Sequence, residues 1–272
     1  MDLLFIFKAI IIAIVEGITE FLPISSTGHM IIVGHVINFT GEFAKLFEVV
    51  IQLGAILAIV VLYWNKIWTS IIKFFKLEHD GLKFWFNILI AVIPAGVLGF
   101  LFDDIIDEKL MNPQTVAAAL IFGAILMIII EYKYRNRNGI DRIEEISYSK
   151  AFIIGVFQCL ALWPGMSRSA STIMGAWLMG VTTVAAAEFS FFLAIPTMVG
   201  ASGLKLIKAG FTLNFGEIVA LIVGFVVAFI VALIVVEKFM NFLKKRPMKG
   251  FAIYRLILGG IIVALMFTNF FK

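Results

Sequence analysis

Charged residues are scarce in this chain of 272 residues, where they make up only 15% of the total. A soluble domain has about 25% charged and roughly 45–50% apolar residues, whereas the apolar share here is 62%. There is too little polar side chain to cover a water-soluble globule of this size. The 28 phenylalanines exclude a disordered chain. The class that remains is a polytopic membrane protein, in which the few ionisable residues become the informative ones.

Cysteine is nearly absent as well. Cys159 is the single cysteine, so no disulfide can form within the chain. The net charge is +4, but it does not indicate a nucleic-acid partner. The basic residues are concentrated in particular loops, which is a signal of membrane topology.

Long apolar runs, in contrast, are abundant. A spanning helix needs about 20 residues, and six runs approach this length: 46–64, 84–102, 115–130, 187–204, 218–236 and 251–267. Four further apolar stretches are too short to span: 3–15, 30–37, 151–163 and 173–181. Polar breaks join these four into two pairs, which indicates two re-entrant helical hairpins, at about 3–38 and 151–181. We therefore expect an all-α integral membrane protein with six spanning helices and two re-entrant hairpins.

The two halves of the chain repeat weakly. Residues 14–28 read IVEGITEFLPISSTG and residues 156–169 read VFQCLALWPGMSRS, so that Glu16 corresponds to Gln158 and, further on, Glu48 to Glu188. Each half then contains one hairpin and three spans, the first repeat at 1–138 and the second at 148–272. Because three is an odd number, the repeats have opposite orientations in the membrane. An inverted repeat with broken helices places a binding site near the midplane, where the hairpin tips meet.

The basic residues predict the orientation. Segments 65–83, 131–150 and 237–250 hold 14 of the 22 lysines and arginines, whereas 103–113 and 205–217 hold few. By the positive-inside rule the first three segments are cytoplasmic, so both termini lie outside. Segment 65–83 also carries tryptophans and phenylalanines among its lysines, and either lies flat on the inner membrane interface or simply anchors the chain there.

Two acidic residues occur in the first hairpin. Glu16 and Glu20 are four residues apart on a short helix, so both carboxylates share one face. Carboxylates at membrane depth need a proton, a cation or an arginine partner. We therefore predict that Glu16 and Glu20 bind a divalent cation, Mg²⁺ or Ca²⁺. The structural alternative is an ion pair with Arg168 that locks the two hairpins together.

Hydroxyl groups follow the acidic pair. Pro23 ends the first half-helix, and Ser25, Ser26 or Thr27 can cap the second. Hydroxyls and backbone N–H groups at a helix N-terminus also form an anion site. His29 follows Ser26 by one helical turn, within reach of its hydroxyl. This spacing predicts a nucleophile and a proton shuttle, with capping as the structural alternative for the serines.

The second polar tip reads PGMSRSAST over 164–172, and Arg168 is the only basic residue that we expect at midplane depth. A guanidinium flanked by the hydroxyls of Ser167 and Ser169 matches phosphate oxygens bidentately. A phosphate hydrolase needs carboxylates for a cation, an oxygen nucleophile, a proton shuttle and a charge clamp, and this chain offers a candidate for each. A carrier of lipid phosphate, or a protein that both cleaves and flips it, remains an alternative, although a carrier needs no nucleophile.

The motif EGITEFLPISSTGH at 16–29, together with PGMSRSAST at 164–172, resembles those of the undecaprenyl-diphosphate phosphatase family, also called the bacitracin-resistance protein family. The resemblance covers the whole chain in length and order of spans. It implies an enzyme of the bacterial cell membrane that removes the terminal phosphate from undecaprenyl diphosphate and so regenerates the lipid carrier of cell-wall synthesis. It also implies dependence on a divalent cation and a site open to the outer face.

The resemblance implies roles for five residues. Glu16 and Glu20 match the family's acidic pair, Ser26 and His29 its catalytic serine and histidine, and Arg168 its phosphate-binding arginine. The reaction expected is attack of Ser26 on the terminal phosphorus, with His29 or Glu20 taking its proton. Attack by a water that His29 activates, with Ser26 only binding phosphate, is the open alternative.

Two further comparisons limit the interpretation. At Ala170 the family motif leads us to expect glycine, so the tip differs there if that glycine serves a positive φ angle. Lipid phosphatases of the acid-phosphatase type need a second histidine after their Ser-Arg motif, and no histidine follows His79 here. That class is therefore discarded.

Overall fold

The structure is a computed structural model that describes residues 3–135, 139–209, 213–268 and 270–271. Arg137 in the basic segment 131–150 and residues 210–212 in the segment 205–217 lie outside the described residues. All regular elements in the described ranges are helices, apart from one isolated bridge between Ile140 and Val181. In chain order they are α1 (Leu3–Thr19), α2 (Ser26–Val36), α3 (Glu42–Leu62), α4 (Trp64–Phe75), α5 (His79–Lys109), α6 (Pro113–Tyr134), η1 (Ile143–Glu145), α7 (Tyr148–Gln158), η2 (Cys159–Leu162), α8 (Arg168–Leu178), α9 (Thr183–Ala209), α10 (Phe215–Leu243) and α11 (Lys249–Met266).

Six of these helices, α3, α5, α6, α9, α10 and α11, are long and apolar enough to cross a membrane. The all-α class and the six predicted spans are thus confirmed. Most of the helices extend past the apolar runs that predicted them. The acidic segment after 102, expected as a loop, instead forms the last turns of α5, which ends at Lys109. An apolar run marks only the part of a helix that is suited to lipid, whereas the helix itself continues into the polar surroundings.

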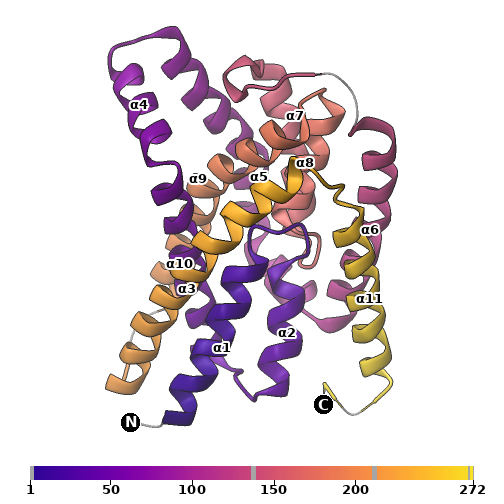
Figure 1. The fold of residues 1–272 in the computed structure, drawn as a ribbon. Helices are drawn as coiled ribbons and strands as arrows, with labels where there is room; N and C mark the ends of the chain where they lie inside the picture. Colours follow the sequence, from indigo (N-terminus) through magenta and orange to yellow (C-terminus); the bar gives the residue numbers. More distant parts are fainter. Residues whose placement is uncertain (1–2, 136–138, 210–212, 269, 272) are drawn as a thin grey trace.

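Short helices pair into two helix–turn–helix units, α1 with α2 and α7 with α8. In Figure 1 the first unit starts from the end of the molecule where α1 begins and α11 ends, and the second lies toward the opposite end, so that the polar turns meet in the interior. Their place in a membrane and the inverted repeat stay predictions.

The two tips have the same backbone turn. Ser25 has φ 69° and Ser167 has φ 69°, and each is the N-cap of the helix that follows, accepting from the N–H of Gly28 at 3.4 Å and of Ala170 at 3.3 Å. Ala170 itself lies within α8 and is not among the positive-φ residues. The expectation that a glycine there would serve a positive φ is therefore wrong, and alanine fits the helix.

Small residues bring the helices close together around the first hairpin. A Cβ on Gly17 of α1 would lie 2.8 Å from the Ala228 carbonyl oxygen of α10, and a Cβ on Gly54 of α3 would lie 2.5 Å from that of Phe225. Many large apolar side chains of the spanning helices point outward, among them Phe100, which is 71% exposed. An outer surface of this kind is suited to lipid.

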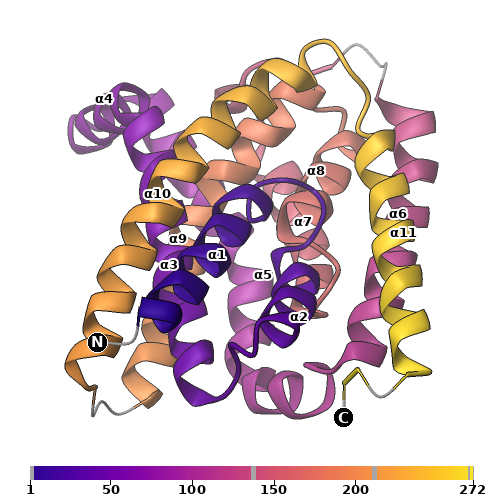
Figure 2. The same cartoon turned by 60° about the horizontal axis from the view of Figure 1, so that its bottom comes forward.

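Ion pairs connect α4 to η1 and α9 at one end of the molecule. Lys66 Nζ lies 3.0 Å from Glu144 Oε1 of η1 and 3.0 Å from Glu188 Oε1 of α9. Burial acts to raise the pKa of Glu144, but its backbone hydrogen bond and Lys66 outweigh this, and the pKa lies below the ordinary value. Figure 2 shows α4 itself standing away from the bundle. Its outward face carries Trp64, Trp68 and Phe75, all exposed.

Candidate active site

Glu20 lies where the two tips meet. The Ser26 hydroxyl donates to Glu20 Oε2 at 2.7 Å, and Arg168 Nη2 of the second tip lies 3.5 Å from Glu20 Oε1. Glu20 and Arg168 are both largely buried, with side chains 7% and 10% exposed. The structure thus brings together a hydroxyl, the carboxylate that accepts its hydrogen bond, and a largely buried guanidinium.

Arg168 is held from one side only. Its Nη1 donates to the carbonyl oxygen of Ser190 at 2.9 Å and lies 3.3 Å from the Ser190 hydroxyl. Thr172 fixes that hydroxyl at 2.7 Å, and the Phe21 ring lies 5.7 Å from the guanidinium carbon. Among the described residues, the Nε and Nη2 atoms make no hydrogen bond. Nε therefore remains for an oxygen of an anion, and Nη2, which has only its 3.5 Å ion-pair contact with Glu20 Oε1, can serve a second oxygen in the fork geometry that suits phosphate.

Glu16 lies one turn before Glu20 and is only 3% exposed. Its Oε1 has no hydrogen-bond partner in the described part of the chain. A buried carboxylate oxygen without a donor requires a proton or a cation. No group of three or more histidine, cysteine, aspartate or glutamate side chains is arranged to hold a metal within the described ranges. A cation here would therefore take its remaining oxygen ligands from substrate and water.

Two cavities open onto these residues. A cavity of about 150 Å³ lies between the tips. Its lining includes Glu20, Ser25, Ser26, Thr27, Ser167 and Arg168. A larger one of about 780 Å³ is lined by Glu16, Ser26, Thr27 and Glu48 in the interior and by Lys45, Asp107 and Lys205 toward the end of the molecule away from α4. Ser26, Thr27 and Gln52 line both. A path lined by both apolar and polar side chains thus leads from that end of the molecule to the tips.

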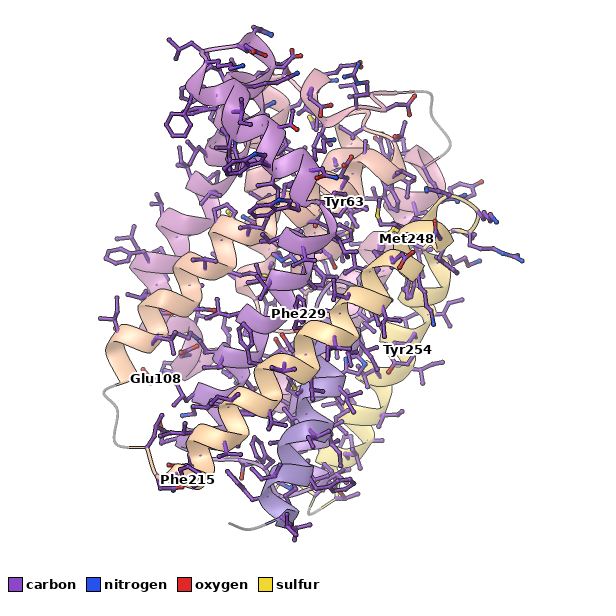
Figure 3. All side chains as sticks on the ribbon, turned by 60° about the vertical axis from the view of Figure 1, so that its left-hand side comes forward. Tyr63, Glu108, Phe215, Phe229, Met248 and Tyr254 are labelled. Carbon is purple, nitrogen blue, oxygen red and sulfur yellow. The ribbon has the colours of Figure 1, made fainter. Side chains whose placement is uncertain are left out.

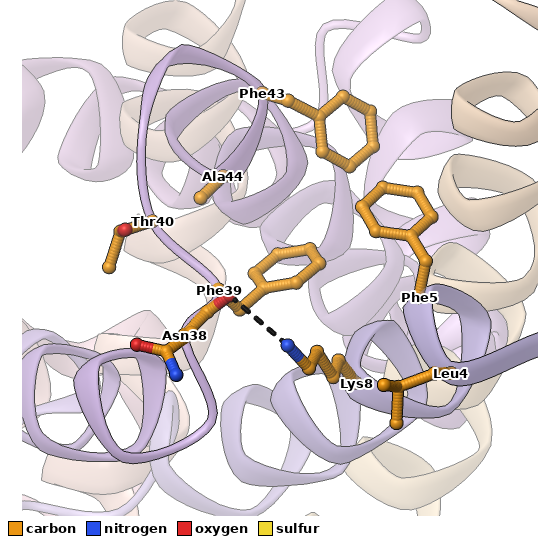
Figure 4. Close-up of a pocket in the computed structure, with 8 residues that line it drawn as sticks. All are labelled: Leu4, Phe5, Lys8, Asn38, Phe39, Thr40, Phe43 and Ala44. Carbon is orange, nitrogen blue, oxygen red and sulfur yellow. Dashed lines mark hydrogen bonds between the residues drawn. The ribbon is translucent and has the colours of Figure 1, made fainter. Parts of the chain in front are cut away.

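A further cavity of about 140 Å³ lies beside the start of α1 (Figure 4). Phe5, Phe39 and Phe43 line it, and Lys8 Nζ donates to the carbonyl oxygen of Asn38 at 3.4 Å. None of the nucleophilic or acidic residues of the tips is part of this lining. Its aromatic character and its place distinguish it from the site between the tips.

His29 differs from its expected arrangement. The hydroxyl of Ser26 is bonded to Glu20, and both ring nitrogens of His29 have other neighbours: Nδ1 lies 2.7 Å from the Ser25 carbonyl oxygen and Nε2 lies 2.7 Å from the Tyr254 hydroxyl. The expected bond between His29 and Ser26 is thus not formed. One turn of spacing permits that contact but does not determine which face of α2 the ring occupies.

The predicted substrate-binding hydroxyls divide into two groups. Thr27 lines both cavities of the site, and Ser25 and Ser167 combine a place in the smaller cavity with helix capping. Ser169 is fully buried and donates to the Leu22 carbonyl oxygen of the other hairpin at 3.0 Å. The capping alternative therefore describes Ser25 and not Ser26, Ser167 caps the equivalent helix of the second tip, and Ser169 bonds the two hairpins to each other.

Several residues of the site were not found from the sequence. Ser190 holds Arg168, Gln52 lines both cavities, and Arg255 is a second basic residue beside the tips, fully buried. Arg255 was detectable, because it lies inside the predicted span 251–267. Ser190 and Gln52 carry no such signal, since isolated small polar residues are common in spanning helices.

Together, the fold and the site define a multi-pass membrane protein with a half-buried serine, two buried carboxylates and a largely buried arginine around an internal cavity, the groups suited to phosphate chemistry. The model of one protein family, described as bacitracin resistance protein BacA, matches residues 9–261. The chain belongs to this family.

Relatives named undecaprenyl-diphosphatase match nearly the whole length of the chain. The chain is similar to undecaprenyl-diphosphatase of Clostridium tetani, with 60% identity over 97% of both chains. It is similar to undecaprenyl-diphosphatase of Clostridium novyi, with 57% identity over 98% of both chains. It is also similar to undecaprenyl-diphosphatase 2 of Clostridioides difficile, with 52% identity over 99% of this chain and 98% of the relative.

Proposed function

We infer that this protein is an undecaprenyl-diphosphate phosphatase: it hydrolyses undecaprenyl diphosphate to undecaprenyl phosphate and inorganic phosphate. Recycling of the lipid carrier supports cell-wall synthesis and resistance to bacitracin. The family and the names of relatives at 50–60% identity support this activity. Within the molecule, the observation that supports it most is Ser26, a hydroxyl bonded to a buried carboxylate beside a buried arginine.

We propose that Ser26 is the nucleophile and Glu20 its base. Attack forms a bond between Ser26 Oγ and the terminal phosphorus and breaks the bond from that phosphorus to the bridging oxygen. The serine proton passes to Glu20 Oε2, which lies 2.7 Å away. Undecaprenyl phosphate leaves, and a water then releases inorganic phosphate from the phosphoserine. Direct attack by water is the competing route, and trapping of phosphate on Ser26 separates the two.

Arg168 clamps the phosphoryl group in this proposal. Arg168 lines the cavity between the tips, where charge develops on the phosphoryl oxygens, and its Nε and Nη2 make no hydrogen bond among the described residues. The N-termini of α2 and α8, capped by Ser25 and Ser167, add backbone N–H groups at the same place. Thr27 contributes a hydroxyl to the lining.

A divalent cation, Mg²⁺ or Ca²⁺, fits the acidic pair. Glu16 offers a buried oxygen with no donor, and Glu20 lies one turn away. Two carboxylates facing a diphosphate give a strongly anionic site, and Arg168 supplies one positive charge. When bound, a hard cation would neutralise part of this charge and orient phosphate oxygens. Glu16 and Glu20 would then hold it, and Glu20 would retain its contact with Ser26.

The protein is a multi-pass membrane protein. We propose the bacterial inner membrane as its location, with both termini outside and the site open to the outer face. Support comes from the 14 basic residues in alternate segments and from the large cavity, which reaches the end of the molecule away from Lys66.

The orientation is tested by cysteine labelling in a Cys159→Ala background. Glu108→Cys, on the exposed end of α5 (Figure 3), should react with an impermeant thiol reagent in intact cells. Asp141→Cys, also exposed, should be shielded until the cells are opened. The opposite pattern would reverse the protein.

The activity itself is tested with purified protein and a C55 prenyl diphosphate. Release of inorganic phosphate, with and without a chelator, is measured, and Ser26→Ala is the matched inactive variant. No release by the wild-type protein, in the presence of either cation, would refute the proposed function.

A further inference from the structure

His29 contacts two groups on different helices. Its Nδ1 lies 2.7 Å from the Ser25 carbonyl oxygen, which only accepts, so Nδ1 carries the proton. Nε2 of the neutral ring is then an acceptor, and the Tyr254 hydroxyl donates to it at 2.7 Å. The two rings stack, with centroids 5.5 Å apart and planes 8° from parallel. The Ser25 carbonyl thereby fixes which nitrogen of His29 is protonated, and the Tyr254 hydroxyl bonds the other nitrogen and holds the ring in place.

The other end of this chain of contacts is a strained residue. Ser25 is not glycine, yet it has φ 69°. Such a conformation is unfavourable for a residue with a Cβ and persists only where the surroundings hold it. The bond from His29 to the Ser25 carbonyl is one such constraint, and Ser26 is the next residue. The contacts from Tyr254 through His29 therefore end at the turn that presents the nucleophile.

Arg255, the next residue on α11, reaches the other tip. It is fully buried, and its Nη2 lies 3.2 Å from the Gly165 carbonyl oxygen and 3.4 Å from that of Ala119. Its Nε and Nη1 make no hydrogen bond among the described residues. Gly123 leaves room for the guanidinium, since a Cβ there would overlap Arg255 Nη2. A buried cation with carbonyl oxygens as its partners is costly, and its contact with the tip points to a positional role.

One short stretch of α11 thus contacts both tips. Figure 1 and Figure 2 show α11 beside α6, and Figure 3 shows Tyr254 part way along it. We propose that Tyr254 and Arg255 are positioning residues for the hydrolysis, Tyr254 holding the first tip through His29 and Ser25, and Arg255 holding the second tip through Gly165. The proposal rests on the proposed function. It also assigns His29 to positioning rather than to proton transfer.

Tyr254→Phe tests the first contact, because it keeps the ring and its stacking but removes the hydroxyl. We expect kcat to fall about two- to tenfold, the scale of one neutral hydrogen bond, with KM within about twofold. Tyr148→Phe, at a similarly exposed tyrosine on α7 (47% against 43%), is the matched control and should leave both constants unchanged. An unchanged kcat in Tyr254→Phe would overturn the role of Tyr254.

The coupling between Tyr254 and His29 is tested in the double variant. If Tyr254 acts through His29, then Tyr254→Phe in a His29→Ala background causes no loss beyond that of His29→Ala. A further loss of several fold would show that Tyr254 acts independently, which contradicts the proposal.

His29→Asn separates positioning from proton transfer. Its amide N–H can take the place of Nδ1–H and donate to the Ser25 carbonyl, but an amide is not a base. We expect His29→Asn to retain at least about fivefold more kcat than His29→Ala. Equal losses in the two variants would identify His29 as a proton carrier and overturn this part of the proposal.

Arg255→Met and Arg255→Lys test the second contact. Methionine keeps much of the volume and removes every donor, and we expect at least a tenfold loss of kcat. Lysine keeps the charge and a nitrogen donor, but its side chain is one atom shorter and does not place Nζ where Nη2 meets the Gly165 and Ala119 carbonyls, so we expect a loss of about two- to fivefold. If the methionine variant does not fold, the lysine variant decides. A folded variant of either kind with wild-type kcat refutes the role of Arg255.

All values are ratios to the wild-type protein. Failure of the wild-type protein to release phosphate refutes the proposed function. If the wild-type protein is active but the Tyr254, His29 and Arg255 variants do not show the expected losses, only the positioning roles are refuted.

Discussion

The two hairpin tips have the same backbone but opposite charge. In each, a serine at φ 69° caps a short helix and the turn contains a proline. The first tip follows two glutamates, whereas the second contains Arg168 and has Gln158 at the place that corresponds to Glu16. The comparison shows that the turn is a scaffold and that the chemistry comes from a few side chains. Neither tip alone has both the base and the clamp, so the site exists only where they meet.

The largest effect is expected from removing the negative charge that joins the tips. Glu20→Gln deprives Ser26 of its proton acceptor and Arg168 of its partner. We expect turnover to fall by at least about a hundredfold, the lower range for loss of a general base, while the protein still folds. Phosphate release is the measurement, with exposed Glu237→Gln as the control. A Glu20→Gln enzyme within tenfold of wild type would show that the base lies elsewhere.

The clamp of the second tip comes next. Arg168→Lys keeps the charge but loses the fork that matches phosphate oxygens. Activity should drop by at least about tenfold, the equivalent of roughly 1.4 kcal/mol in the transition state. Arg246→Lys, at an exposed arginine, serves as the control in the same phosphate assay. Near-normal turnover would mean that Arg168 acts only as a point charge or in a structural ion pair.

Glu16→Gln makes the first tip more like the second, where glutamine occupies the corresponding place. An amide is sterically acceptable there and still offers one oxygen, so we expect the enzyme to fold and to require more metal ion. The measurement is a titration of phosphate release with Mg²⁺ and with Ca²⁺ for both proteins. If the wild-type enzyme keeps full activity in excess chelator, the proposed divalent cation is not required. The buried acidic pair must then be stabilised by protonation instead.

The smallest effect concerns the shared backbone. Glycine adopts φ near 69° without the cost that alanine carries, which is on the order of 1 kcal/mol. The difference in unfolding free energy between Gly and Ala variants should therefore be wider at Ser25 and Ser167 than at Ser147, a cap with φ −80°. Denaturation in detergent measures it. Equal differences at all three serines would mean that the tips carry no strain.

The sequence predicted the spans well because apolar length is a local property that the bilayer imposes. It predicted which residues lie at the tips for a similar reason, since a polar segment inside an apolar pair stands out. Helix ends such as Lys109 were missed, because helices continue beyond the apolar core.

Side-chain partners were harder to predict than positions. The bond from Ser26 to Glu20 and the turning of His29 toward Tyr254 depend on contacts between residues far apart in the chain, the latter pair separated by 225 residues. Spacing along one helix defines a face but not the neighbour that meets it. Arg255 was overlooked inside a span that was itself correctly predicted, although a charge in such a run is the kind of residue that marks a site.

The ion pair between Glu20 and Arg168 has a consequence for how the protein is made. The two tips are encoded far apart: Ser169 and Leu22, which are bonded across them, are separated by 147 residues. At synthesis rates of 5–20 residues per second, about 7–30 s pass between the appearance of the acidic tip and that of its basic partner. During that interval the nascent first hairpin has two carboxylates and no arginine. The pair between Glu20 and Arg168 can form only once the second half of the chain has been made, so that the assembly of the active site is a late step of folding.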